Sequence, residues 1–342
     1  MAAVPEPAEQ RAEHHIRSKA MSHCVICRAQ GVAMYQDLTD RFFASAGQWN
    51  FVRCARPQCG ILWLDPMPLE CDIWKAYRDY YTHDEGGGSA ERSHGMVRAI
   101  LQSIKRAYLA ARLGYTDRKV NWREQIVSGL AYLDPTRRAD TDFPLKYLPY
   151  KSGGRMLDLG CGSGDLLERM SSLGWRAEGV DFDSAAVEVA RRRGLRVRTG
   201  SLHQQQFPDG TFEAVVMSHV IEHIHQPLQL LKEVRRILKR GRRLVIATPN
   251  AHSLGHRMLG SRWPFLDPPR HLQVFTPHAL STLAFAAGFE EVRVCTEIRT
   301  AAAMLPRIDG SPLLGRLLEY GENLALHLDR NMGEEIALVA IK

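Results

Sequence analysis

Residues 156–165 have the sequence MLDLGCGSGD. The apolar residues at its start predict a buried β-strand, and the residues after the last glycine continue into a helical pattern. Gly160, Gly162 and Gly164 have no Cβ atom, so the backbone N–H groups of the intervening turn can approach a ligand closely. The helix N-terminus behind the turn favours an anionic group. The stretch therefore predicts a strand, a turn that binds a ligand, and a helix.

The residues around the glycines exclude two common phosphate-binding motifs. The dinucleotide fingerprint G-x-G-x-x-G requires glycine at position 165, where this chain has Asp165, whose carboxylate would repel a pyrophosphate. A P-loop requires Gly-Lys-Ser/Thr, which is missing. S-adenosylmethionine has no phosphate, so its carboxylate can face the turn while Asp158 faces its amino and sulfonium groups. We therefore expect S-adenosylmethionine to contact Asp158, Gly160, Cys161, Gly162 and Gly164.

A second acid follows at the spacing expected for a ribose contact. The next predicted strand ends in Gly179-Val180-Asp181. A carboxylate about 20 residues after the glycines, at a strand end, can accept hydrogen bonds from both ribose hydroxyls. We assign this role to Asp181 and include Phe182 in the cofactor site. A tight turn without a ligand would leave both strand-end acids, Asp158 and Asp181, unexplained.

Strands and helices alternate from residue 154 onward, which is typical of a mainly parallel sheet with crossover helices. The predicted strands cover 155–159, 176–181, 195–199, 212–217, 244–248, 291–297 and 335–341. The predicted helices cover 165–173, 184–193, 228–239, 277–287 and 311–328. The fold class is therefore α/β, with a Rossmann-like sheet of seven strands and helices on both faces.

The residues before this sheet are organised differently. We expect a disordered tail over 1–20, a cysteine-containing module over 21–68, a helical linker or cap over 69–150, and the sheet domain over 151–342. Helical spacing of apolar residues predicts a short helix over 69–81 and further helices within 95–133. The alternation stops over 249–276, which is long for a plain connection and indicates a functional lid.

Four of the seven cysteines form two short pairs near the N-terminus: Cys24, Cys27, Cys54 and Cys59. Two pairs of thiolates across a short β segment suit a tetrahedral structural zinc site. An odd number of cysteines in a chain without a secretory signal does not suit a disulfide framework. His23 or Cys71 could replace one ligand.

Composition and charge limit the setting and the partners. The chain has no secretory signal and no run of about 18 apolar residues, so we expect a cytoplasmic protein without a membrane span. Its formal charge of +7 would suit RNA or a nucleotide-linked substrate, although arginine usage alone can produce it. We expect a small-molecule acceptor in preference to a nucleic acid. The oligomeric state is not encoded in any pattern that we recognise.

Residues 154–297 resemble the class I S-adenosylmethionine-dependent methyltransferases, and in particular the branch that includes ubiquinone O-methyltransferases. The matching motifs are Asp158 to Gly164, Gly179-Val180-Asp181, Phe207 to Phe212 and Ser218-His219-Val220-Ile221-Glu222-His223. The resemblance implies a methyltransferase of class EC 2.1.1. It also implies that Ser201 and Leu202 lie beside the adenine of the cofactor. Ser218 and His219 would line the part of the site that holds the methionine moiety and the substrate.

Residues 51–68 resemble the N-terminal zinc-ribbon leader of bacterial methyltransferases that are often associated with sugar or polysaccharide tailoring. The resemblance implies structural zinc and a hydroxyl of a sugar or other metabolite as the acceptor.

Two histidines are candidates for the general base that an oxygen acceptor requires. His271 lies in the proline-rich lid, and His223 follows the fourth strand of the sheet. His223 also completes an H-x-x-E-H pattern known from zinc peptidases. We reject a catalytic metal there, because the pattern follows a strand and meets Pro227 instead of lying within a long helix.

Two alternatives from other classes remain. An RNA methyltransferase could use the cysteine module to bind nucleic acid, but residues 24–64 are not densely basic and the fourth strand lacks an Asn/Asp-Pro-Pro-Tyr motif. A non-enzymatic partner protein could retain the fold, but the intact Asp158, Gly160, Gly162 and Asp181 do not favour it.

Overall fold

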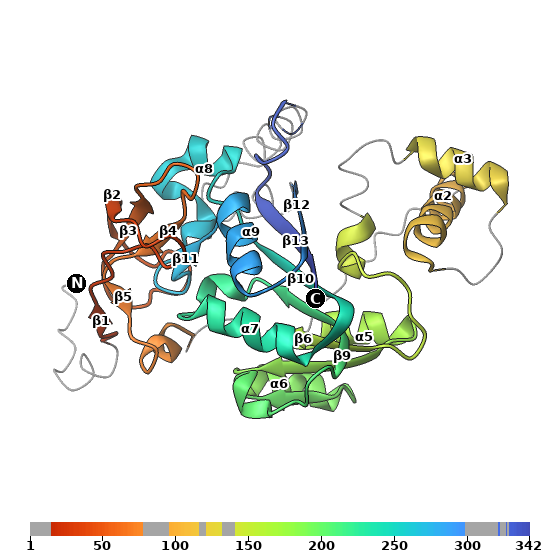
Figure 1. The fold of residues 1–342 in the computed structure, drawn as a ribbon, viewed down its shortest axis with the longest axis horizontal. Coiled ribbons are helices and arrows are strands. Elements are labelled where there is room, and N and C mark those ends of the chain that lie inside the picture. Colours follow the sequence, from red (N-terminus) through yellow and green to blue (C-terminus); the bar gives the residue numbers. More distant parts are fainter. Residues whose placement is uncertain are drawn as a thin grey trace, which may run out of the picture.

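The computed structural model describes residues 15–77, 96–115, 121–131, 141–297, 321, 326 and 328–342. Its centre is a sheet of seven strands in the order β12-β13-β10-β9-β6-β7-β8 (Figure 1). The strands are β6 (Arg155–Leu159), β7 (Arg176–Asp181), β8 (Val197–Thr199), β9 (Phe212–Ser218), β10 (Leu238–Pro249), β12 (Glu291–Glu297) and β13 (Glu335–Ile341). β13 runs antiparallel to both of its neighbours, while the pairs formed among β6 to β10 are parallel. The predicted sheet is therefore confirmed.

The central strands are buried on both faces because helices cover each side. α5 (Asp165–Ser172) and α6 (Ser184–Arg192) pack with Met156, Ala214 and Val216. α7 (Pro227–Ile237) and α9 (Pro277–Ala286) pack with the alternate residues Leu157 and Val215. Successive side chains of a strand point to opposite faces, so continuous apolar runs such as Ala214–Met217 fit this arrangement.

The N-terminal residues form a second, smaller sheet that includes a strand from the predicted lid. Its order is β11-β4-β3-β2, with β2 (Gly31–Leu38), β3 (Trp49–Cys54), β4 (Leu62–Leu64) and β11 (Gln273–Val274). β11 pairs with β4 through Gln273 opposite Trp63 and Val274 opposite Leu62. Figure 1 shows this sheet next to α8 (Leu254–Leu259), beside one end of the main sheet. The segment predicted to be a lid is thus anchored to the N-terminal sheet.

Residues 249–276 contain short helical elements where the sequence predicted a loop. They include α8 (Leu254–Leu259) and the 3-10 turns η5 (Gly260–Arg262) and η6 (Pro264–Leu266). Trp263 is 1% and Phe265 5% exposed, and the indole N–H of Trp263 donates to Glu334 (2.7 Å). Both aromatic rings therefore serve the packing of this segment.

Several predicted boundaries differ from the structure. Residues 15–20 do not belong to a frayed tail, because Ile16 is buried and β1 (Ser18–Lys19) pairs with β5 (Met67–Pro68). The helix predicted over 69–81 is a 3-10 turn, η1 (Ile73–Tyr77), as far as the described residues extend. Most of the helix predicted over 311–328 lies outside the described residues.

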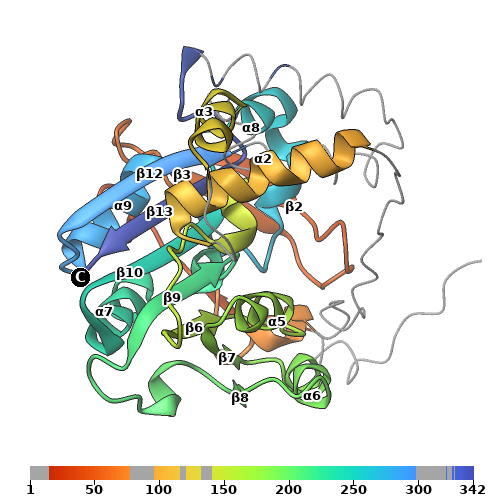
Figure 2. The ribbon, with the colours of Figure 1, turned by 90° about the vertical axis from the view of Figure 1, so that its right-hand side faces the viewer.

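Two helices occupy the stretch predicted to be helical before the main sheet. They are α2 (Met96–Leu113) and α3 (Trp122–Ala131), which pack together to the right of the sheet in Figure 1 and in front of it in Figure 2. The 3-10 turn η2 (Phe143–Leu145) follows and leads to β6. No helix among the described residues is long and apolar enough to cross a membrane.

Candidate functional site

The glycine turn between β6 and α5 has the backbone that its sequence predicts. Gly160, Gly162 and Gly164 have φ values of +71°, +51° and +92°, a region that favours glycine. A Cβ atom at Gly160 would lie 2.4 Å from Val220, and one at Gly164 would lie 2.3 Å from Leu195. Positions 160 and 164 therefore require glycine for both conformation and space, and position 162 for conformation.

A cavity of about 270 Å³ opens beside this turn. Its lining consists of Phe143, Pro144, Lys146, Asp158, Gly160, Cys161, Leu166, Arg169 and Ser218. Four of these residues, Asp158, Gly160, Cys161 and Ser218, belong to the predicted cofactor site. Burial, together with the nearby Asp181, raises the pKa of Asp158 to about 7, against the opposing effect of Lys146. A bound cation would replace the lost solvation and favour the charged carboxylate.

Asp181 lies at the end of β7, next to the glycine turn. Its Oδ2 accepts a hydrogen bond from the N–H of Gly162 (2.8 Å), and its Oδ1 accepts one from the N–H of Asp183 (2.9 Å). Burial raises its pKa, and those two backbone hydrogen bonds oppose the rise. The carboxylate is therefore fixed in orientation by the turn that it borders.

Lys146 is a cavity residue that the sequence patterns did not indicate. It is 7% exposed, has φ +50°, and its ammonium donates a hydrogen bond to Ser218 Oγ (3.1 Å). The same Nζ lies 3.5 Å from the centre of the Phe143 ring. The cavity therefore has a buried cation as well as a buried acid. No motif marks Lys146, since it precedes the strand in an irregular segment.

The remaining predicted cofactor residues occupy different surroundings. Phe182 is 59% exposed, and its ring meets that of Tyr77 edge-on, with the centroids 5.2 Å apart. Ser201 is exposed and held by Gln204, whereas Leu202 is buried. His219 has φ +54° and lies between two buried glutamates, Glu222 and Glu335. Although burial lowers it, hydrogen bonds and ion pairs to both acids raise the pKa of His219 to about 10.

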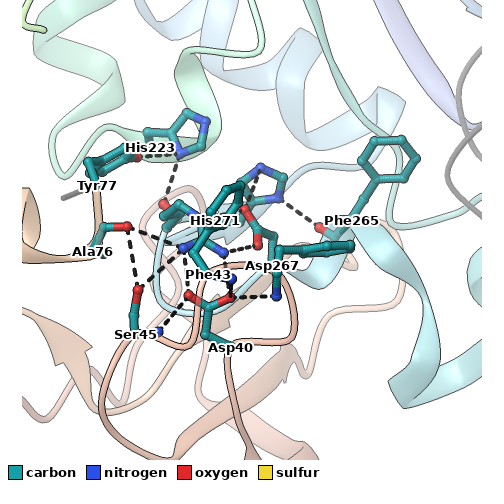
Figure 3. Close-up of polar contacts among 11 residues, drawn as sticks. Asp40, Phe43, Ser45, Ala76, Tyr77, His223, Phe265, Asp267 and His271 are labelled. Carbon is teal, nitrogen blue, oxygen red and sulfur yellow. Dashed lines mark hydrogen bonds and ion pairs between the residues drawn. The ribbon is translucent and has the colours of Figure 1, made fainter. Parts of the chain in front are cut away.

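The structure brings the two predicted catalytic histidines together. The rings of His223 and His271 lie edge to face, with centroids 4.8 Å apart. Figure 3 shows Tyr77 next to His223, and its hydroxyl is 2.9 Å from the Nδ1 atom of His223. Since Tyr77 also meets Phe182, one aromatic side chain connects the end of β7 with the histidine pair.

Backbone carbonyls determine the tautomer of both histidines. His223 Nδ1 is 2.9 Å from the carbonyl oxygen of Arg270, and His271 Nδ1 is 2.7 Å from that of Phe265. A carbonyl oxygen only accepts hydrogen bonds, so each Nδ1 carries the proton and each Nε2 presents a lone pair. Burial and the neighbouring His271 lower the pKa of His223 to about 4, against the effect of Glu222. Both imidazoles therefore present an Nε2 lone pair, and His223 is neutral at neutral pH.

The four predicted cysteines also come together. Their sulfur atoms all lie within 4.8 Å of one another. The distances are 3.7 Å between Cys24 and Cys59 and 3.3 Å between Cys27 and Cys54. Zn–S bonds of about 2.3 Å in a tetrahedron separate the sulfurs by about 3.8 Å, so the donor set and its dimensions fit zinc. Among the described residues the cluster contains neither His23 nor Cys71.

The H-x-x-E-H pattern does not lie in a long helix. His219 follows β9, and Ile221–His223 form the 3-10 turn η4. Within this turn Glu222 is fully buried and accepts a hydrogen bond from Thr248 (2.9 Å). The H-x-x-E-H pattern therefore begins directly after a strand, as the sequence predicted.

Residues 135–294 match the family model described as a methyltransferase domain. This part of the chain is therefore similar to methyltransferase domains. The chain is 29% identical, over 162 residues, to the ubiquinone biosynthesis O-methyltransferase of Aeromonas salmonicida, covering 42% of this chain and 68% of that protein. It is 32% identical, over 146 residues, to a probable S-adenosylmethionine-dependent methyltransferase of Mycolicibacterium smegmatis, covering 42% of this chain and 55% of that one.

Among solved structures, a SAM-dependent methyltransferase from Archaeoglobus fulgidus aligns with 22% identity and a TM-score of 0.45, covering 65% of this chain and all of the other. The chain spans about half the length of several curated relatives that it matches. The cysteine cluster lies outside residues 135–294, so the family match does not extend to it.

Proposed function

We propose that this protein transfers a methyl group from S-adenosylmethionine to a hydroxyl of a small-molecule acceptor, such as a sugar or another metabolite. The observation that carries the proposal is the cavity beside the glycine turn, which holds Asp158 and Lys146. The methionine end of S-adenosylmethionine has an ammonium and a carboxylate. A cavity that offers one acid and one cation next to backbone amides is complementary to that pair.

The remaining predicted cofactor residues follow the same orientation. Asp181 would accept hydrogen bonds from the ribose hydroxyls, and Phe182, Ser201 and Leu202 would lie on the adenine side. Ser218 lines the same cavity and would face the methionine part of the cofactor. His219 would support that side indirectly, since its ring is engaged by Glu222 and Glu335.

The cofactor supplies an electrophilic methyl group, and the protein must align the acceptor and remove its proton. His223 and His271 both present Nε2 as a proton acceptor. The close packing of the two rings contributes to the low pKa of His223, because His271 is one of its causes beside burial. We assign them jointly as the base pair for the acceptor hydroxyl.

We further infer that residues 21–68 form a module whose four cysteines hold a structural zinc ion. The two sulfur pairs come from turns next to β2 and β3, so the ion would cross-link the small sheet. Zinc there would supply folding free energy and no chemistry of methyl transfer.

Calorimetric titration of the purified protein with S-adenosylmethionine and, separately, with NADH tests the cofactor assignment. We expect binding of the first alone. The acceptor class is tested by incubating the protein with methyl-labelled cofactor and a metabolite extract, and then with total RNA. Label in small molecules, lost in His223→Gln and His271→Gln, supports the proposal. Label in RNA, or binding of NADH, contradicts it.

A further inference from the structure

Arg270 is a fully buried arginine that connects the lid to the N-terminal module. Its two terminal nitrogens donate to the two carboxylate oxygens of Asp40, at 2.7 and 2.8 Å. Its Nε donates to Asp267 (2.9 Å), and Nη1 also donates to the carbonyl oxygen of Ala76 (3.2 Å). Asp40 and Asp267 have their side chains directed toward this shared centre (Figure 3).

The partners of Arg270 in the N-terminal module form one rigid turn. Asp40 accepts hydrogen bonds from the backbone N–H groups of Phe42 and Phe43 at 2.9 and 3.1 Å, and from that of Ser45 at 3.0 Å. The Phe43 ring lies 4.5 Å from the guanidinium carbon of Arg270. Although burial raises it, hydrogen bonds from Arg270 and Ser45 hold the pKa of Asp40 below its ordinary value. The turn and the guanidinium therefore stabilise each other.

The other side of Arg270 reaches the histidine pair. Its carbonyl oxygen accepts the Nδ1–H of His223, and the next residue in the chain is His271. Ala76, which its guanidinium holds, precedes Tyr77, whose hydroxyl also contacts His223 Nδ1. The Arg270 carbonyl and the Tyr77 hydroxyl, which both contact His223 Nδ1, therefore lie on segments that the Arg270 side chain holds in place.

A buried cluster of this kind is stable only when its charged groups are paired. A buried guanidinium needs its acids, and each buried acid needs the guanidinium, because an unpaired charge in the interior is strongly destabilising. Removing either partner is therefore expected to displace the backbone on both sides.

We propose that Arg270 is a positioning residue, which couples the N-terminal module to the active site by holding His223 in its Nδ1–H tautomer. The inference rests on the proposed function only in naming His223 as part of the base pair. The tautomer keeps Nε2 free to accept a proton. Loss of the Arg270–Asp40 contact would release the carbonyl and allow the Tyr77 hydroxyl to donate to Nδ1, which places the proton on Nε2.

The test is nitrogen NMR of protein labelled with ¹⁵N-histidine, without cofactor or acceptor, at a pH at which His223 is neutral. The signals of His223 and His271 are identified by their loss in His223→Gln and His271→Gln. We expect the Nδ1–H tautomer at His223 in the wild type. In Arg270→Met, Arg270→Lys and Asp40→Asn, we expect the Nε2–H tautomer to become the major form.

Arg155→Met is the matched control, because Arg155 also pairs with an acid, Glu178, and lies over an aromatic ring, Phe212, but at the start of β6. It should leave His223 unchanged. If Arg270→Met does not fold, Asp40→Asn decides, since it retains Arg270 and its contact with Asp267. Retention of the Nδ1–H tautomer in a folded Asp40→Asn or Arg270→Lys protein would overturn the proposal. Failure to bind S-adenosylmethionine would instead refute the proposed function and leave this result standing.

Discussion

Lys146 Nζ lies 3.1 Å from Ser218 Oγ in the cavity that Asp158 also lines. The two charged groups come from different parts of the chain, since Lys146 precedes β6 and Asp158 lies within it. Lys146 lowers the pKa of Asp158, while burial raises it. The cavity thus places a lysine ammonium beside a carboxyl group that a bound cation would favour in its charged form.

The first prediction concerns Lys146. If its ammonium binds the methionine carboxylate, Lys146→Met should weaken S-adenosylmethionine binding about 10- to 100-fold, because a hydrogen bond to a charged group contributes about 1.5–3 kcal/mol. Methylthioadenosine lacks the carboxylate and should bind both proteins equally well. Calorimetry with the two ligands measures the difference. Lys239→Met, which removes a lysine paired with Glu213 on the surface, is the control. Equal losses for both ligands would argue against the contact.

Local patterns were sufficient to predict the glycine turn and the acids around it. Gly160, Gly162 and Gly164 require left-handed backbone, and Asp181 lies at a strand end, so short-range chemistry marks each of them. Lys146 carries no such mark, because its position depends on how an irregular segment folds over the sheet. The sequence therefore predicts the two acids of the candidate cofactor site, Asp158 and Asp181, but not its cation, Lys146.

Contacts between distant segments were only partly predictable. His223 and His271 were each predicted from their place at the carboxyl ends of the strands, but their packing at 4.8 Å depends on the lid. That lid is held by the pairing of β11 with β4, and by Arg270 with Asp40, 230 residues apart. The spacing of apolar residues along the chain contains no information on which acid pairs with Arg270. Nothing in the sequence distinguished this buried arginine from the other basic residues.

The second prediction concerns Asp181. Asp181→Ala should weaken S-adenosylmethionine binding at least about tenfold, because the ribose loses a charged acceptor. The variant also removes the hydrogen bond to the N–H of Gly162, so Asp181→Asn, which preserves an acceptor oxygen, should lose less. Asp183→Ala removes only the cap of α6 and should leave the affinity nearly unchanged. Calorimetry measures all three, and unchanged affinity in Asp181→Ala would refute the ribose contact.

The third prediction concerns the cysteine cluster. The purified protein should contain about one zinc ion per chain, and Cys54→Ser should lose it. The melting temperature should fall as well, since the carbonyl oxygen of Cys59 accepts a hydrogen bond from Thr276, which caps α9 (2.6 Å). Elemental analysis and thermal unfolding report the two effects. Cys71→Ser, at an exposed cysteine outside the cluster, should change neither. Full zinc content in Cys54→Ser would exclude Cys54 as a ligand.

The fourth prediction concerns the dependence of stability on pH. The pKa of His219 is about 10 in the folded protein, above the ordinary value near 6.5. Between about pH 6.5 and 10, the folded state therefore keeps a proton on His219 that the unfolded state has already released. The stability that His219 contributes is fully present below pH 6.5 and is lost as the pH rises through 10.

His219→Asn tests this dependence. Asparagine suits the position, because it tolerates the left-handed φ of +54° better than most residues. The melting temperature of the wild type should fall more steeply between pH 7 and 10 than that of His219→Asn. Glu222 is the partner acid; although burial raises its pKa, His219 holds it at about 2, so the pair stays charged down to that pH. The exposed His278→Gln should follow the wild-type curve. Parallel curves for the wild type and His219→Asn would show that the ring is not protonated in the folded protein.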